Sequence, residues 1–84
     1  MYQVNLSNRA EKELRKLDKR FKEKVIYTLR LLRSNPFLGQ KMTGDFQGSY
    51  RIKIPPIRII YEIDFSNKII WVRAIRHRQG SYKE

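Results

Sequence analysis

Residues 48–64 constrain the fold more than any other stretch, because apolar side chains alternate with polar ones on both sides of Pro55-Pro56. A period of two is typical of half-buried strands, so this stretch predicts two antiparallel strands joined at the prolines. With the prolines as the turn, Ile54 faces Ile57 and the apolar side chains share one face. That face comprises Tyr50, Ile52, Ile54, Ile57, Ile59, Tyr61 and Ile63.

The opposite face of this hairpin concentrates positive charge. In the same register Lys53 faces Arg58 and Arg51 faces Ile60, which brings three cations together. Like charges directly opposite in a sheet are destabilising by a few tenths to ~1 kcal/mol per pair. A cluster that opposes folding indicates an anionic ligand, whereas the alternative is a charged surface that keeps the sheet soluble and protects its edge. These residues alone leave both interpretations open.

Length and composition predict one small domain that spans residues 1–84. The sequence has no cysteine and a single histidine, which excludes disulfides, thiol catalysis and cysteine-ligated zinc, and we expect no cofactor. No apolar run approaches the roughly 20 residues that cross a bilayer, and no signal peptide opens the sequence. We therefore expect a cytoplasmic protein.

The net charge is +11, from 19 Lys and Arg against 8 Asp and Glu. Both halves of the chain carry this excess, so the domain itself is cationic. Nucleic acid, an acidic protein and an anionic membrane surface are the candidate partners, and net charge does not choose among them.

The N-terminal third predicts a strand and a helical hairpin. Residues 2–6 alternate between apolar and polar side chains, as in a short strand. Ser7 or Asn8 then caps a helix whose apolar residues recur every three or four positions. Asp18 is a second cap, so we expect the stripe to break into two helices near residues 17–19.

The remaining elements complete an α+β fold. Asn35-Pro36 ends the second helix, because the residue before a proline is displaced from the α region. Residues 36–49 form a connecting loop, with one strand-like turn as an option, that leads to the hairpin. Ser66-Asn67 is then a turn into a last strand at residues 68–75. The core face stays apolar through the pairs Ile63–Ile70, Tyr61–Val72 and Ile59–Ala74. We predict an N-terminal strand, a two-helix hairpin and a twisted antiparallel sheet of about four strands with helices on one face.

The tail from Arg76 to Tyr82 follows a strand whose outer residues continue the face of the three cations. Metal-independent RNA cleavage needs a base for the 2′-hydroxyl, an acid for the leaving 5′-oxygen and cations for the phosphorane. The cations, the imidazole of His77 and the phenol of Tyr82 would supply such groups if they converge. The ordinary alternatives are a surface histidine and a tyrosine that packs the tail on the sheet.

Four more residues are candidate RNA contacts. Trp71 and Arg73 alternate onto the outer face of the last strand, where an exposed tryptophan can stack on a base. Lys12 and Lys16 belong to the basic side of the helices, where they bind RNA phosphates or are simply solvated.

Three ordered motifs resemble the RelE branch of the RelE/ParE toxin superfamily. Their succession is more specific than any one of them, and the resemblance covers nearly the whole chain. The motifs are Gly48-Ser49-Tyr50-Arg51-Ile52-Lys53-Ile54, then Arg58-Ile59-Ile60-Tyr61-Glu62-Ile63-Asp64, then His77-Arg78 with Tyr82.

The resemblance implies the toxin of a type II toxin–antitoxin pair, an endoribonuclease that enters the ribosomal A site and cuts the mRNA there. Its expected partners are an antitoxin and the ribosome with its mRNA, with no membrane and no small-molecule cofactor. By position, Lys53 or Arg51 activates the 2′-hydroxyl, and Arg58 and Arg78 hold the phosphate. Tyr82 stacks on a base or moves a proton. His77 lies where relatives often have a histidine, catalytic in some branches.

Several positions depart from the family pattern. Pro55-Pro56 replaces a turn such as Gly-Asp, and proline cannot supply the positive φ of a primed turn. A cis Pro56 in a type VI turn is one alternative. Arg51 stands where lysine is common, although arginine stays charged and accepts protons poorly. Ile57 replaces a frequent aromatic residue, and Arg76 replaces a usual glycine.

Two other functions remain as alternatives. ParE-like proteins of the same fold act on DNA gyrase and are not nucleases, although the basic strand residues together with a tail arginine and tyrosine favour the nuclease. A catalytically silent RNA-binding module is the third hypothesis. In each toxin case we expect an acidic, partly helical antitoxin that covers the helical hairpin or the cationic sheet face.

Overall fold

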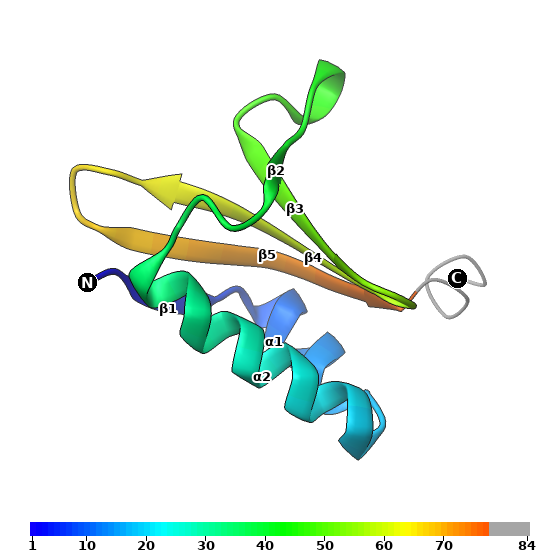
Figure 1. Cartoon of the computed structure of the whole chain (residues 1–84). Coiled ribbons are helices and arrows are strands. Elements are labelled where there is room, and N and C mark those ends of the chain that lie inside the picture. The colour runs from blue at the N-terminus through cyan, green and yellow to red at the C-terminus, as the bar shows by residue number, and fades with distance from the viewer. Residues whose placement is uncertain (78–84) are drawn as a thin grey trace.

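The computed structural model describes residues 1–77 and shows one five-stranded sheet with helices packed on it (Figure 1). This confirms the predicted α+β fold with a two-helix hairpin. In chain order the elements are β1 (Gln3–Leu6), α1 (Asn8–Arg15), α2 (Lys19–Ser34), β2 (Gln40–Lys41), the 3₁₀ helix η1 (Gly44–Phe46), β3 (Ser49–Ile54), β4 (Ile57–Asp64) and β5 (Ile69–His77).

The strand order across the sheet is β1-β5-β4-β3-β2. β1 lies parallel to β5, and the other neighbouring strands are antiparallel. The sheet therefore has one strand more than the expected four, and it is mixed rather than purely antiparallel. The extra strand is the two-residue β2, which lies in the segment expected to be a loop.

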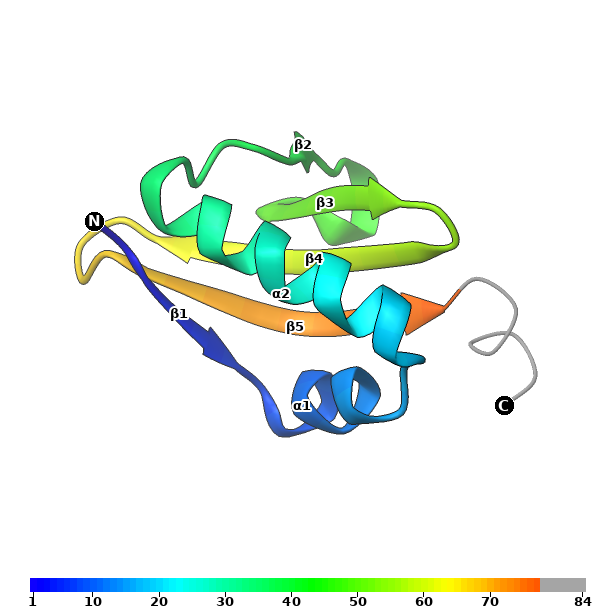
Figure 2. The same ribbon diagram turned by 60° about the horizontal axis from the view of Figure 1, so that its bottom comes forward.

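The helical hairpin breaks where the sequence predicts it. Ser7 caps α1, because its hydroxyl oxygen accepts a 3.0 Å hydrogen bond from the backbone N–H of Ala10. Asp18 takes the N-cap position of α2, without a hydrogen bond from its side chain. Figure 2 shows α1 and α2 on the same face of the sheet, so no α-helix in residues 1–77 covers the other face of β3, β4 and β5.

Tyr61 connects the chain after α2 to the centre of the sheet. Its side chain is fully buried, and its hydroxyl donates to the carbonyl of Pro36 at 2.8 Å. The same oxygen accepts from the N–H of Gly39 at 2.9 Å. The ring stacks on Tyr50 with centroids 5.4 Å apart. Around it lie the other large buried side chains, which are Leu32, Ile57, Ile59, Ile70, Ile75, Val25 and Val72.

The hairpin of β3 and β4 has the predicted register. Ile54 pairs with Ile57, Lys53 with Arg58 and Arg51 with Ile60. The peptide bond between Pro55 and Pro56 is cis, the alternative that the sequence left open for this turn. The apolar faces therefore coincide, and the charged side chains emerge on the opposite face.

The pairing of β4 with β5 follows the prediction for only half its length. Ile63 pairs with Ile70 and Tyr61 with Val72, but a bulge then shifts the register by one residue. The predicted pair of Ile59 with Ala74 is therefore wrong, since Ile59 pairs with Ile75. The shift has a physical reason: it buries Ile75 to 1% exposure, whereas strict alternation would place this residue among the charges.

Candidate functional site

A row of three cations crosses the sheet near the proline turn. Arg58 on β4 pairs with Lys53 on β3 and with Arg76 on β5. Directly paired residues in a sheet have Cα atoms about 4.5–5.5 Å apart, so these side chains leave the sheet as immediate neighbours. The structure thus confirms the predicted adjacency of Lys53 and Arg58 and adds a third member.

Arg51 is the fourth member of this group. It lies two residues before Lys53 on β3, on the same face of the sheet, and it pairs with Ile60 of β4, which in turn pairs with Ala74 of β5. We call Arg51, Lys53, Arg58 and Arg76 the cationic face. None of these four side chains makes an ion pair with a carboxylate in residues 1–77. The Nε atoms of Arg51 and Arg76 are buried and have no hydrogen-bond partner among the described residues. The group is therefore short of acceptors among these residues, and an anion bound to this face would supply them.

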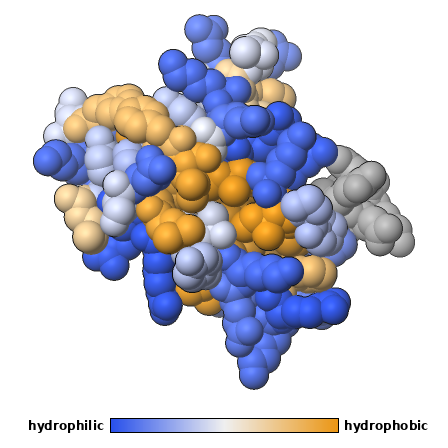
Figure 3. Space-filling view, viewed as in Figure 1, coloured by the Kyte–Doolittle hydropathy of each residue, from blue (hydrophilic) through white to orange (hydrophobic). Residues whose placement is uncertain are grey.

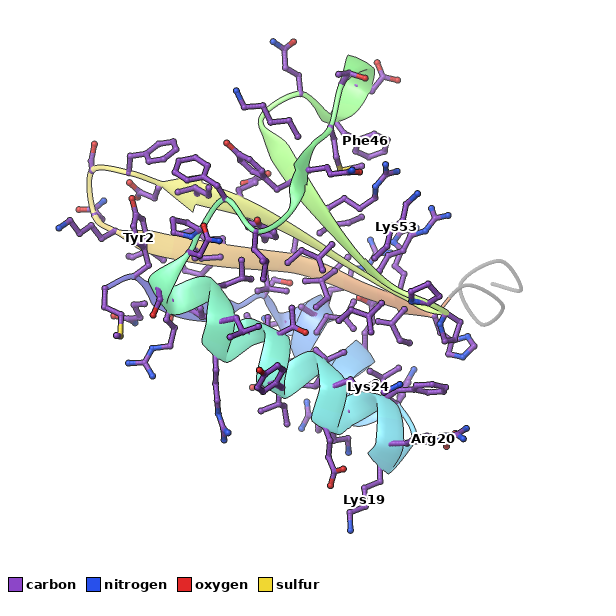
Figure 4. All side chains as sticks on the ribbon, in the orientation of Figure 1. Tyr2, Lys19, Arg20, Lys24, Phe46 and Lys53 are labelled. Atoms are coloured by element: carbon purple, nitrogen blue, oxygen red, sulfur yellow. The ribbon has the colours of Figure 1, made fainter. Side chains whose placement is uncertain are left out.

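Figure 4 shows Lys53, one member of the cationic face, on the side of the sheet away from α2. The labelled side chain of Lys53 projects to that side, whereas Lys19, Arg20 and Lys24 extend from α2. A hollow of about 280 Å³ lies beside it at the turn, lined by Lys53, Arg58, Pro55, Pro56 and Ile57. The hollow gives a ligand access to Lys53 and Arg58, two of the four cations. The backbone of an extended polyanion could lie along this open surface.

The nearest carboxylate on this face is already neutralised. Glu62 pairs with Trp71, and its Oε1 accepts hydrogen bonds from Nε and Nη2 of Arg73 at 3.1 and 3.0 Å. The Arg73 guanidinium also lies 5.8 Å from the Trp71 ring centroid. Trp71 and Arg73 therefore flank the cationic face as predicted, but Arg73 offers less free charge than the four cations.

His77 does not join the cations. Because of the bulge it follows Arg76 onto the helix side of the sheet, where its ring meets Phe21 of α2 edge to face, with centroids 5.8 Å apart. The expected convergence of this imidazole with Arg51, Lys53 and Arg58 is therefore not found. The sequence left a surface histidine as the alternative, and the structure instead shows a half-buried ring that packs against Phe21.

The other candidate residues lie elsewhere. Lys12 and Lys16 are exposed on α1 and at its C-cap, on the helix side of the sheet, so they are remote from the cationic face. Arg78 and Tyr82 lie outside the described residues. The structure therefore brings together Arg51, Lys53 and Arg58 from the predicted set, flanked by Trp71 and Arg73.

Sequence reasoning missed Arg76 as a member of the face. The sequence did contain a sign of this. Strict alternation after Trp71 would expose the apolar side chain of Ile75 and bury the charged side chain of Arg76, and both placements are unfavourable. A one-residue bulge between them and Trp71 corrects both.

Two hydrogen bonds from outside the sheet, one with Ser7 and one with Glu13 of α1, stabilise the bulge in β5. The Ser7 hydroxyl donates to the carbonyl of Arg73 at 3.0 Å, and the Ile75 N–H donates to Oε1 of Glu13 at 2.8 Å. The pairing of β1 with β5 ends at Leu6 and Val72, and no other strand in residues 1–77 pairs with this edge of β5 beyond that point. The bonds from Ser7 and to Glu13 satisfy backbone groups there. The same contacts fix the direction in which Arg76 leaves the strand.

Other kinds of site are not visible in the described residues. No cluster of three or more His, Cys, Asp or Glu side chains in residues 1–77 could hold a metal ion. No helix in the same residues is long and apolar enough to cross a membrane. A larger hollow of about 700 Å³ is lined by residues 41–44 and 47–50 together with Ile63 and Phe65.

Comparison with known proteins shows which family the chain belongs to. A family model described as the ParE toxin of the type II toxin–antitoxin system parDE matches residues 4–82. The chain belongs to the RelE/ParE toxin family. The candidate toxin RelE1 of Methanocaldococcus jannaschii is 31% identical over 90 residues, which cover 98% of this chain and 96% of that protein.

Solved structures of this toxin family share the fold. The toxin–antitoxin complex RelBE2 of Mycobacterium tuberculosis superposes with a TM-score of 0.85 at 23% identity, over 92% of this chain and 98% of that one. The isolated RelE toxin of E. coli gives a TM-score of 0.80 at 23% identity, over 99% and 95% of the two chains. The YoeB/ParE toxin of Agrobacterium tumefaciens gives 0.79 at 20% identity, over 89% and 96%.

Proposed function

We propose that this toxin is a ribosome-dependent endoribonuclease that cuts mRNA in the A site. The cationic face carries the proposal, because four cations gather on β3, β4 and β5 without an ion pair to a carboxylate in residues 1–77. RNA phosphates suit such a face, since guanidinium groups bind phosphate oxygens through parallel hydrogen bonds. The similarity to a RelE-named relative over 96% of its length supports the nuclease branch of the family.

In the proposed reaction the 2′-oxygen of one nucleotide attacks its own 3′-phosphorus. The bond from phosphorus to the next 5′-oxygen breaks, which leaves a 2′,3′-cyclic phosphate and a 5′-hydroxyl end. A base takes the 2′-proton and an acid protonates the 5′-oxygen, while cations stabilise the phosphorane. DNA lacks the nucleophile, so the activity is confined to RNA.

The residues of the face divide these roles by their chemistry. Lys53 is the proposed base, because it is the one member that can give up its proton, whereas guanidinium groups stay charged. Arg51 and Arg58 hold the phosphate oxygens. Arg78 and Tyr82 are proposed, on the family pattern, as a further phosphate ligand and as the group that stacks on a base or moves a proton.

A cognate antitoxin is the second proposed partner. Four of the similar structures are complexes of a RelE-type toxin with an antitoxin or an antitoxin peptide, and the net charge of +11 favours an acidic antitoxin here. Figure 3 shows apolar surface in the middle of the molecule, between α2 and the strands, surrounded by hydrophilic residues. Ile26, Tyr27 and Leu31 of α2 are also exposed, at 36%, 62% and 41%. An amphipathic helix of the antitoxin fits such a surface.

Inhibition of DNA gyrase without nuclease activity is the second candidate function. The observation that favours it is the family match itself, since that family model carries the ParE description. The two functions differ in what stops in the cell: translation in the first case and replication in the second.

The test is to induce the protein without an antitoxin and to map mRNA 5′ ends in cells. We expect new 5′ ends inside translated codons, and weaker cutting by the Arg78→Ala and Tyr82→Phe variants. The double variant Arg58→Ala/Arg78→Ala should lose cleavage while the domain stays folded. Arg30→Gln, which removes one charge from α2 on the other side of the sheet, is the matched control and should cut like the wild type.

The other outcomes separate the alternatives. Arrest of growth with intact mRNA and stalled replication would favour gyrase as the target. Absence of arrest would indicate a silent RNA-binding relative. Full arrest by the double variant would contradict the assignment of the site.

A further inference from the structure

Arg76 is the member of the cationic face that neither the family motifs nor the strict strand pattern predicts. We propose that Arg76 binds an RNA backbone phosphate together with its cross-strand partner Arg58, and so extends the phosphate site from β4 onto β5. This inference rests on the proposed function in one respect: it takes RNA as the ligand.

The backbone geometry gives the first support. Arg76 is paired directly with Arg58, and the residues beside them in the chain face the helix side: Ile57, Ile59 and Ile75 are buried, and His77 is half-buried against Phe21. The two arginine side chains therefore leave the other face of the sheet together. The bulge produces this arrangement, and the bonds from Ser7 and Glu13 to β5 fix it. Bulges next to functional sites commonly re-aim a side chain in this way.

The second support is the cost of the arrangement to the free protein. The row from Lys53 through Arg58 to Arg76 contains two pairs of like charges, and each pair opposes folding. In addition, Nε of Arg76 is buried without a hydrogen-bond partner in residues 1–77. Most buried side-chain donors in folded proteins have an acceptor, so an unpaired Nε at this position calls for a role beyond stabilising the fold.

The third support is the fit of a phosphate group. An arginine offers five N–H donors in a fixed plane, and two neighbouring arginines can hold different oxygens of one phosphate. A phosphate that draws Arg76 outward also gives Nε the acceptor that it lacks. One anion therefore relieves both the repulsion and the unpaired donor.

The experiment measures binding separately from cleavage. A short single-stranded RNA with 2′-O-methyl groups cannot be cut, and its affinity for the full chain is measured by fluorescence anisotropy over a range of salt concentrations. For single strands the slope of log K against log salt falls by about 0.7 for each phosphate that the protein no longer binds. Arg76→Gln should lose about tenfold in affinity and about 0.7 in slope.

Two further variants test charge and geometry. Arg76→Lys keeps the charge but not the planar donors, so it should restore the slope while the affinity recovers only in part. Arg30→Gln on α2 removes one charge from the other side of the sheet and should keep the wild-type slope.

Thermal unfolding then distinguishes a binding role from a structural one. Arg76→Gln should raise the midpoint, by up to about 5 °C, because it removes a like-charge pair. A lower midpoint would show that Arg76 supports the fold, and would overturn the proposal.

The results also distinguish failure of this inference from failure of the proposed function. An unchanged slope and affinity for Arg76→Gln, or wild-type protein that does not bind the RNA at low salt, would overturn the Arg76 site. Wild-type protein that binds the RNA through Arg76 but never cuts mRNA on ribosomes would leave the Arg76 site standing and contradict the nuclease.

Discussion

The backbone N–H of Ile75 donates a 2.8 Å hydrogen bond to Oε1 of Glu13, 62 residues earlier in the chain. This contact joins the last turn of α1 to the bulged part of β5. One residue further along, Arg76 enters the cationic face. Thus a carboxylate on the helix side of the sheet helps to position a cation on the other side.

The first prediction concerns this contact. Glu13→Ala removes the acceptor of a partly buried N–H and should lower the free energy of unfolding by about 2 kcal/mol. Glu13→Gln keeps an oxygen in place and loses only the exposed ion pair with Arg9, so we expect a loss below about 1 kcal/mol. Urea unfolding measures both values.

Glu11→Ala is the control for Glu13. It removes an ion pair with Arg15 in which both side chains are more than half exposed, and it should change the stability by less than about 0.5 kcal/mol. Equal losses for Glu11→Ala and Glu13→Ala would show that the bond to Ile75 contributes no more than a surface pair.

The second prediction concerns the base. Lys53→Arg keeps the positive charge and the reach to phosphate but cannot accept a proton, so single-turnover cleavage on mRNA-programmed ribosomes should slow by about 10²-fold or more. Binding of the 2′-O-methyl RNA should stay within about threefold of wild type, because the phosphate contact remains. Cleavage by this variant at the wild-type rate would move the base to another residue.

The third prediction concerns the close approach of Gly39 to β3. A Cβ atom at this position would lie 2.8 Å from the Arg51 carbonyl oxygen and 2.9 Å from the Tyr61 hydroxyl. Gly39→Ala must therefore displace backbone or break the Tyr61 hydrogen bonds, and should cost about 1–3 kcal/mol in urea unfolding. The exposed neighbour Gln40 provides the control, since Gln40→Ala should stay within about 0.5 kcal/mol. Equal stability of the two variants would contradict the close packing at Gly39.

Local patterns were sufficient to predict most of the fold. Alternation around Pro55-Pro56 predicts the register of β3 and β4, and Ser7 and Asp18 take the N-cap positions at which the sequence predicts that the two helices begin. The two-residue β2 has no periodicity of its own and exists only because β3 offers it an edge. Non-local pairing of this kind does not follow from a local pattern.

Local patterns also predict some residues of the candidate site, whereas tertiary contacts determine the position of others. The adjacency of Lys53 and Arg58 follows from their alternation, whereas the exchange of His77 for Arg76 depends on a bulge held by Glu13 and Ser7. The sequence contained the conflict at Ile75 but not the contacts that resolve it. Bulges depend on such tertiary contacts, so the side chains beyond them are the hardest to place.

The last prediction concerns Tyr61 and high pH. Burial raises the pKa of the Tyr61 hydroxyl above its ordinary value of 10.0, although the hydrogen bond from the Gly39 N–H opposes the shift. Because the unfolded chain then releases this proton first as pH rises, the stability contribution is complete below pH ~10 and is lost as pH rises through the folded-state pKa.

Tyr61→Phe isolates this effect. The variant leaves the Pro36 carbonyl and the Gly39 N–H without their partner, and should lose about 1–3 kcal/mol near pH 8. Above pH ~10 the wild type alone loses the Tyr61 contribution, so the difference between the two proteins should shrink. Tyr27→Phe removes a phenol that is 62% exposed, and near pH 8 it should change the stability by less than about 0.5 kcal/mol. A constant difference between wild type and Tyr61→Phe from pH 8 to pH 11 would show that Tyr61 keeps its ordinary pKa in the folded protein.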